Sequence, residues 1–172
     1  MSSSASAVGH ASRAALDAHK LDRLRALVRD ILPHNAFYAA KFERLGDPAA
    51  IASLAELAEW PFTFKEELVA AGGPGRPANM TWPADRYARF HQTSGTHGRP
   101  LAVLDTADDW RWWMNCWRPI LDRGGVAAGD RVLVASSFGP YAGFWSAFDA
   151  VLDRGAMAIP TGGMTSLARL EA

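Results

Sequence analysis

The sequence predicts an α/β fold in which a helical N-terminal lead precedes an incomplete βαβ portion. Three observations support this class. Apolar residues recur at helical spacing near the start of the chain. Two short apolar runs, at 131–136 and 156–160, lie on either side of a helical pattern. A strand, a helix and a strand within about thirty residues indicate a right-handed parallel βαβ unit.

The helical lead is predicted to open with an amphipathic helix over residues 12–32, which the next residue, a proline, ends. The apolar stripe of this helix is Leu24, Leu27, Val28 and Ile31. A shorter helix is expected near 36–45, and a further turn or two over 54–58. Thr63 and Glu66 form a capping box for a helix that runs to about residue 71.

The middle of the chain is predicted to hold two strands and a long helix. Strands are expected over 87–92 and 101–104, so the polar stretch between them joins two strands. Thr106 and Asp109 form a capping box for the helix that follows. The apolar stripe of that helix, which indicates core packing, is Trp110, Trp113, Met114, Trp117 and Leu121.

The βαβ portion is expected to place its helix over 141–153. The residues predicted to face inward are Phe144, Phe148, Val151 and Leu152. Because both flanking strands are continuously apolar, we expect a sheet covered on both faces. Such a sheet needs more strands than this chain offers, and another helix begins at Thr165. We therefore interpret the chain as a fragment, either natural or from a truncated gene model.

Composition narrows the class of protein. The chain has 172 residues, 49% hydrophobic and 21% charged, which fits a globular protein with a real core. Its 18 basic and 18 acidic residues argue against binding nucleic acid by bulk charge. Its sequence contains no apolar run that could span a bilayer and no secretory signal, so we expect a cytoplasmic protein without a membrane partner. Residues 1–15 are predicted to be a disordered tail, and 16–172 one partial domain.

The single cysteine, Cys116, excludes an internal disulfide framework. Its neighbours are tryptophans, so we expect a buried, inert thiol rather than a nucleophile. His91 is predicted to be a strand residue. Because no carboxylate or cysteine lies at ligand-like spacing from His91 or His97, no metal site is assigned.

The most informative stretch is HQTSGTHGRP at 91–100. Its glycines let the backbone approach a ligand and point N–H groups at it, while hydroxyl groups and a guanidinium add donors suited to phosphate oxygens. The predicted phosphate-binding residues are Thr93, Ser94, Gly95, Thr96, His97, Gly98 and Arg99. The stretch is not a Walker A loop, which needs a Gly-Lys-Ser/Thr ending between a strand and a helix. The alternative is an ordinary solvated turn.

The order of residues in T-S-G-T-x-G-R-P resembles the phosphate-binding signature of the adenylate-forming enzymes, the acyl-CoA synthetase superfamily. The segments at 24–28, 35–42, 60–68, 129–132 and 155–160 are similar to phenylacetate–CoA ligase-type enzymes. The resemblance spans about 24–163. The chain departs from the family at His97, where the family usually has a Thr or Ser hydroxyl.

The resemblance implies an ATP-dependent acid–CoA ligase, which activates a carboxylic acid as acyl-AMP and then forms acyl-CoA. ATP, Mg²⁺ and coenzyme A would serve the complete enzyme, and none is expected to bind tightly to this fragment. A second candidate site follows the strand at 131–136, where open α/β sheets bind ligands and where the family shapes its acyl pocket. Its candidate residues are Phe138, Gly139, Tyr141, Gly143 and Phe144. Their aromatic character suggests an aryl acid.

Three motifs that the family uses later have no match in this sequence: a magnesium-binding glutamate, an aspartate for the ribose and a C-terminal catalytic lysine. We therefore expect the chain alone to be inactive and assign no catalytic residue. Its expected partners are ATP, a small carboxylic acid and either the missing C-terminal portion or a second copy. Two alternatives remain: a non-catalytic nucleotide-binding or scaffold remnant, and an unrelated small α/β protein whose loop is accidental.

Overall fold

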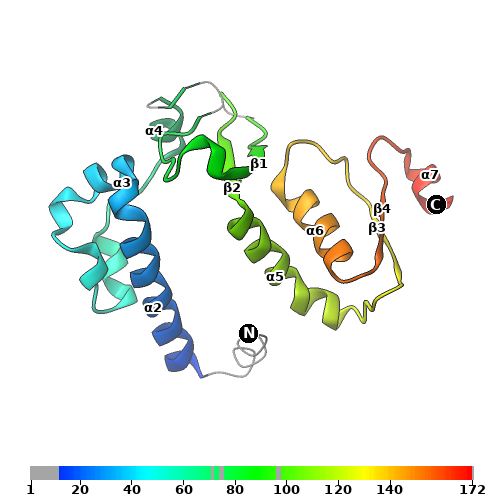
Figure 1. Ribbon diagram of the computed structural model, residues 1–172, viewed down its shortest axis with the longest axis horizontal. Helices are drawn as coiled ribbons and strands as arrows, with labels where there is room; N and C mark the ends of the chain where they lie inside the picture. Colours follow the sequence, from blue (N-terminus) through cyan, green and yellow to red (C-terminus); the bar gives the residue numbers. More distant parts are fainter. Residues whose placement is uncertain (1–11, 71, 74–75, 96–97, 172) are drawn as a thin grey trace. The chain divides into compact units, whose positions relative to one another are not determined.

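The computed structural model describes residues 12–70, 72–73, 76–95 and 98–171 (Figure 1). Within the range that the sequence assigned to one domain, contacts separate two compact units, Met1–Pro83 and Ala84–Ala172. Among the described residues, no helix has both the length and the apolar character needed to cross a membrane.

The first unit is helical, as predicted. Its α-helices are α2 (Arg13–Ile31), α3 (Ala36–Lys41) and α4 (Lys65–Ala70). Short 3₁₀ turns connect them: η1 (Leu32–His34), η2 (Glu43–Leu45), η3 (Pro48–Ala50) and η4 (Leu54–Glu59). The Ser12 side chain caps α2, so residues 13–15 of the predicted tail belong to the helix, whereas 1–11 lie outside the described residues.

Two details of the helical prediction are wrong. Leu27, assigned to the buried stripe of α2, is 54% exposed, and only Val28 of that stripe is fully buried. The carboxylate found at the start of α4 is that of Glu67, whose Oε2 accepts from the Phe64 amide at 2.7 Å. The capping contact thus lies one residue later than the predicted Thr63–Glu66 box, because Glu67 also faces Lys41 Nζ, at 2.5 and 2.7 Å from its two oxygens.

The second unit combines two small sheets with two long helices. Its elements are η5 (Ala84–Arg86), β1 (Tyr87–Gln92), β2 (Ala102–Thr106), α5 (Ala107–Arg123), β3 (Arg131–Val134), α6 (Ala142–Asp153), β4 (Met157–Pro160) and α7 (Ser166–Glu171). Strands β1 and β2 form an antiparallel hairpin. Strands β3 and β4 are parallel and are joined through α6, which confirms the predicted βαβ unit (Figure 1).

The core of the second unit lies between α5, α6 and one face of the parallel pair. Its buried members are Leu121, Ala150, Val151 and Ala156, with Met114, Trp117, Val126, Val132 and Ala158 packed against them. Alternation along β3 and β4 places Val132 and Ala158 on this face. Among the described residues the opposite face is uncovered, with Leu133 and Met157 exposed, so the second cover predicted for the complete sheet is not found within this chain.

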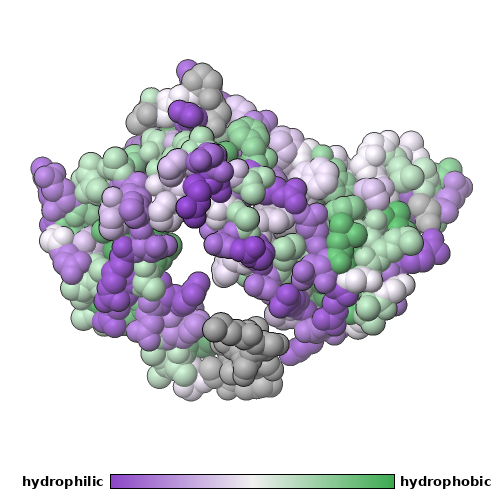
Figure 2. All heavy atoms as spheres, viewed as in Figure 1, coloured by the Kyte–Doolittle hydropathy of each residue, from purple (hydrophilic) through white to green (hydrophobic). Residues whose placement is uncertain are grey.

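Several predicted inward residues are exposed. Phe144 and Leu152 of α6 are exposed, whereas Val151 is buried as predicted, in line with Ser146 and Ala150. Figure 2 shows hydrophobic side chains gathered over the α6 and β4 end of this unit. Cys116 is also exposed, contrary to prediction, because it lies off the stripe that α5 turns toward the core. Partial desolvation nevertheless raises the pKa of its thiol, so it is not an activated nucleophile.

Candidate functional site

The predicted phosphate loop lies between β1 and β2, as the sequence indicated. The last pair of the hairpin joins Gln92 to Ala102. Beyond it, the Thr93 amide donates to the Leu101 carbonyl at 3.0 Å, and the Leu101 amide donates to Thr93 Oγ1 at 3.0 Å. The Thr93 hydroxyl therefore closes the neck of the loop and keeps its own proton available for a ligand.

Two glycines set the shape of this loop. Gly95 has φ +71° and Gly98 has φ +124°, both in the region that favours glycine. The Gly98 amide donates to the Gly95 carbonyl at 3.1 Å. A side chain on Gly95 would also come within 3.0 Å of the Gly98 carbonyl oxygen. Ser94 and Arg99 are exposed, where they could reach a ligand.

Thr96 and His97 lie outside the described residues, so their predicted contacts with phosphate stay predictions. What the described residues provide is a turn with two glycines at positive φ beside an exposed guanidinium, a group that suits an anion.

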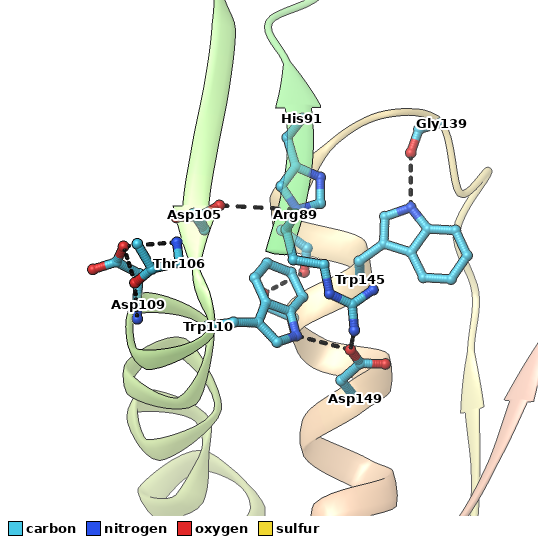
Figure 3. Close-up of polar contacts among 11 residues, drawn as sticks. Arg89, His91, Asp105, Thr106, Asp109, Trp110, Gly139, Trp145 and Asp149 are labelled. Atoms are coloured by element: carbon cyan, nitrogen blue, oxygen red, sulfur yellow. Dashed lines mark hydrogen bonds and ion pairs between the residues drawn. The ribbon is translucent and has the colours of Figure 1, made fainter. Parts of the chain in front are cut away.

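The second candidate site is the loop between β3 and α6. Phe138 adopts φ +45°, which is uncommon for a residue other than glycine. Its ring meets Trp145 at 5.0 Å and Phe148 at 5.6 Å in edge-to-face contacts. The Trp145 indole donates to the Gly139 carbonyl at 3.1 Å, as Figure 3 shows. Contacts from α6 therefore hold an unusual backbone conformation in place.

The remaining predicted acyl-site residues lie at the start of α6. Tyr141 and Phe144 form an edge-to-face pair at 6.2 Å, and both rings are exposed. A side chain on Gly139 would come within 2.6 Å of the Tyr141 ring, so this glycine makes room for that ring. Gly143 has open space around it, so packing does not require a glycine there.

A backbone hydrogen bond joins the two candidate loops. The Gln92 amide at the end of β1 donates to the Pro140 carbonyl at 2.8 Å. The phosphate loop thus starts beside the aromatic loop, although the two are far apart in the sequence. No periodicity or motif predicted this contact, because it depends on how the hairpin packs against the βαβ unit.

A buried polar cluster under the hairpin was missed by sequence reasoning. Arg89 and His91 of β1 lie on one face with Asp105 of β2, and they meet Trp110 of α5 and Asp149 of α6 (Figure 3). Asp149 Oδ2 accepts from Arg89 at 2.5 Å and from the Trp110 indole at 2.8 Å. The only signal was alternation along the strands, which does not reveal the partners of a residue.

His91 and Asp105 are the buried members of this cluster. His91 Nε2 lies 4.0 Å from Asp105 Oδ2, so a carboxylate does approach this histidine, although sequence spacing suggested none. Burial lowers the pKa of His91, an effect that Asp105 opposes and Arg89 reinforces. Burial raises the pKa of Asp105, opposed by His91 and by a hydrogen bond from Trp113. In the parts of the chain described, no three metal-ligating side chains gather.

No protein-family model matches the chain. Phenylacetate-coenzyme A ligase of Pseudomonas putida is 32% identical over 158 residues, which make up 90% of this chain and 35% of that protein. The enzyme of the same name from Aromatoleum evansii is 33% identical over the same shares. The chain therefore spans about a third of the length of these curated relatives.

Solved structures give the same picture. A 2-hydroxyisobutyryl-CoA ligase in complex with 2-HIB-AMP and CoA superposes with a TM-score of 0.78 and 31% identity, over 90% of this chain and 33% of that one. These comparisons confirm the resemblance noted in the sequence, and the fold is that of the N-terminal part of an adenylate-forming ligase.

Proposed function

We propose that this chain, which belongs to the phenylacetate–CoA ligase-like group of adenylate-forming enzymes, supplies the triphosphate-binding loop and part of the acid-binding surface of an ATP-dependent acid–CoA ligase. In the first step an acid carboxylate oxygen attacks the α-phosphorus of ATP, and the bond to the bridging oxygen breaks to release pyrophosphate. In the second step a thiol attacks the acyl carbon and AMP leaves.

The single observation that carries this proposal is the contact between Gln92 and Pro140. In-line attack requires the carboxylate and the α-phosphate to be held in a near-attack geometry. A loop suited to phosphate and a loop rich in aromatic side chains meet at this hydrogen bond. Their adjacency supports binding of ATP and an organic acid side by side.

The proposed roles follow from the donors present. The loop over 93–99 would hold the β- and γ-phosphates through backbone amides and hydroxyl groups, and Arg99 would add a charge-assisted contact. Mg²⁺ would neutralise phosphate charge when bound. The described residues contain no cluster suited to holding this ion, so its protein ligands would come from elsewhere in the complete enzyme.

We further propose an aromatic acid as substrate. The exposed rings of Tyr141 and Phe144, with Phe138 beneath the same loop, offer apolar edges and faces against which an aryl group could pack. Coenzyme A is the proposed acceptor, and cytoplasmic residence remains our expectation. A C-terminal portion or an associated chain would supply the remaining groups.

The test is acid-dependent exchange of labelled pyrophosphate into ATP, with a panel of aryl and aliphatic acids. The 172-residue chain alone is expected to give no exchange above a no-acid control. The product of the complete reading frame is expected to give exchange, strongest with an aryl acid. If that product binds ATP but never exchanges pyrophosphate, it is a nucleotide-binding remnant and the ligase proposal is wrong.

Within that assay, Arg99→Ala should raise the KM for ATP by about tenfold or more, because it removes a charge-assisted contact worth about 1.5–3 kcal/mol. The KM for the acid should change far less. Arg44→Ala, which removes an exposed arginine from η2, is the matched control and should change neither constant. Equal effects of Arg99→Ala on both substrates would contradict the assigned role.

A further inference from the structure

Two buried titratable side chains beneath the phosphate loop carry polar atoms without hydrogen-bond partners among the described residues. His91 is 4% exposed and Asp105 is 8% exposed. Both ring nitrogens of His91 and Oδ2 of Asp105 are buried without a partner among the described residues. The 4.0 Å between His91 Nε2 and Asp105 Oδ2 is too long for a hydrogen bond. Burying such atoms without partners is unfavourable, so a state that pairs them is favoured.

The surroundings restrict how the His91 ring can move. It stacks on the Trp110 indole, with ring centroids 5.0 Å apart and an angle of 20° between the planes. Trp110 is itself anchored by its hydrogen bond to Asp149 and by the Arg89 guanidinium, 4.8 Å from its ring (Figure 3). A shift of the ring along the indole face toward Asp105 would keep this stacking contact.

Charged groups on every packed element face this pair. Arg89 comes from β1 and Asp149 from α6, and these two neutralise each other in an ion pair. Asp109 of α5 acts on Asp105 and raises its pKa, while the Trp113 side chain hydrogen-bonds to Asp105 and lowers it. Burial and Arg89 oppose protonation of His91, and Asp105 is the neighbouring group that favours uptake of a proton by the pair.

His91 is connected to both candidate loops through the next two residues of the chain. Gln92 donates its amide to Pro140, and Thr93 exchanges two hydrogen bonds with Leu101 at the neck of the phosphate loop. A shift of the His91 backbone would therefore reach the first residue of the phosphate loop through two hydrogen-bonded neighbours.

We propose that His91 and Asp105 form a proton-sensitive positioning pair for the phosphate loop. When the pair takes up one proton from solvent, His91 Nε2 donates to Asp105 Oδ2, the 4.0 Å gap closes, and the backbone at the end of β1 adjusts to the new position of the ring. Neither residue touches the proposed substrates. The inference rests on the proposed function in one respect, that the loop over 93–99 binds phosphate. The coupling between the pair and this loop requires no nucleotide.

The experiment is an NMR titration of the 172-residue chain between pH 5 and 8. All samples carry His97→Gln, so that the loop has no titrating group of its own. The His91 ring resonances report proton uptake by the pair, and the backbone amides of Thr93 and Gly95 report the loop. We expect the amides and the ring to shift with the same midpoint.

Three variants separate coupling from general structural effects. His91→Gln should abolish the amide titration. Asp105→Asn should lower the His91 midpoint further, because it removes the carboxylate that favours the imidazolium. Asp108→Asn, the matched control, removes an exposed carboxylate from the first turn of α5 and should leave the midpoint unchanged.

The proposal is overturned if the Thr93 and Gly95 amides do not follow the His91 ring, or if they still titrate after His91→Gln. Both results come from chains that retain Asp105, so they stand even if Asp105→Asn fails to fold. ATP affinity measured across the same pH range separates this inference from the proposed function. Failure to bind ATP at every pH would contradict the proposed function, while a shared midpoint would still establish the coupling.

Discussion

Asn35 makes more polar contacts across the first unit than its size suggests. It is 2% exposed, and its Nδ2 donates to the Asn79 carbonyl and to Thr81 Oγ1, both at 2.9 Å. Its Oδ1 accepts from the Tyr38 amide at 3.0 Å and so caps α3. One side chain thereby ties the start of a helix to a segment more than forty residues away.

Asn35→Ala should destabilise the first unit by about 2–4 kcal/mol, because it removes three partly buried hydrogen bonds that join two distant segments. Asn115→Ala, at an exposed position of α5, is the matched control and should cost less than about 0.5 kcal/mol. Urea unfolding followed by far-UV circular dichroism measures both. A loss below about 1 kcal/mol for Asn35→Ala would mean that water replaces these contacts.

His91 gives a prediction for the pH dependence of stability. Its pKa is lowered by burial in the folded chain, so the unfolded chain binds the proton more readily. The stability that neutral His91 contributes is present above about pH 6.5, the pKa of an unfolded histidine, and is lost as the pH falls below that value. Asp105 acts in the opposite sense: because its pKa is raised in the folded chain, its contribution to stability falls as the pH rises.

His91→Gln should therefore flatten the decline in unfolding free energy between pH 7.5 and 5.5, measured by urea unfolding. His34→Gln, which alters an exposed histidine of η1, should retain the decline. If the two variants decline equally, His91 is not the group that sets this pH dependence.

At the scale of elements, α5 shows how much of this fold is encoded locally. Thr106 accepts from the Asp109 amide at 3.2 Å, while Asp109 Oδ2 accepts from the Thr106 amide at 2.9 Å and from its hydroxyl at 2.7 Å. This capping box was predicted from the sequence, because both partners lie within one turn. The bounds of β1 and the end of α2, just before Pro33, were likewise predicted from the local sequence.

Thr106→Ala should cost about 1–2 kcal/mol in the second unit, because α5 carries Leu121 and Trp110 into the buried interior. Thr165→Ala removes a similar contact, to the Ala168 amide, at the start of the short, exposed α7. That variant should cost less than about 0.5 kcal/mol, because none of the described residues of α7 is buried. Urea unfolding of both variants measures the loss of unfolding free energy. Equal losses would show that the capping contact of α5 adds no more to stability than that of α7.

At the scale of the whole molecule, the sequence did not predict the contacts that unite the site. The Gln92–Pro140 hydrogen bond and the His91–Asp105 approach both join segments whose separation is set by tertiary packing. The exposure of Cys116 and Leu27 was likewise missed, because residue type alone does not say which side of a helix finds a neighbour. The division into two units was not predicted either, although a stretch rich in glycine and proline, 72–83, comes just before the boundary.

The loop itself was predicted because its residues have a chemistry that few other loops share. Glycines with positive φ were found where the pattern placed them, between two strands. The contacts that hold the loop in place, from Pro140 and Leu101, depend on tertiary packing and could not be predicted from the loop residues. The central claim is therefore that this hairpin loop binds phosphate.

Titration of the ¹⁵N-labelled 172-residue chain with inorganic triphosphate, and separately with ATP, tests that claim most directly. The largest amide shifts should fall on Gly95, Gly98 and Arg99, saturating in the high micromolar to millimolar range, roughly the weak affinity expected of a small anion site. Arg99→Ala should weaken the affinity by about tenfold, and Arg44→Ala should not change it. Shifts centred elsewhere in the chain, or none at millimolar triphosphate, would contradict the assignment of this loop.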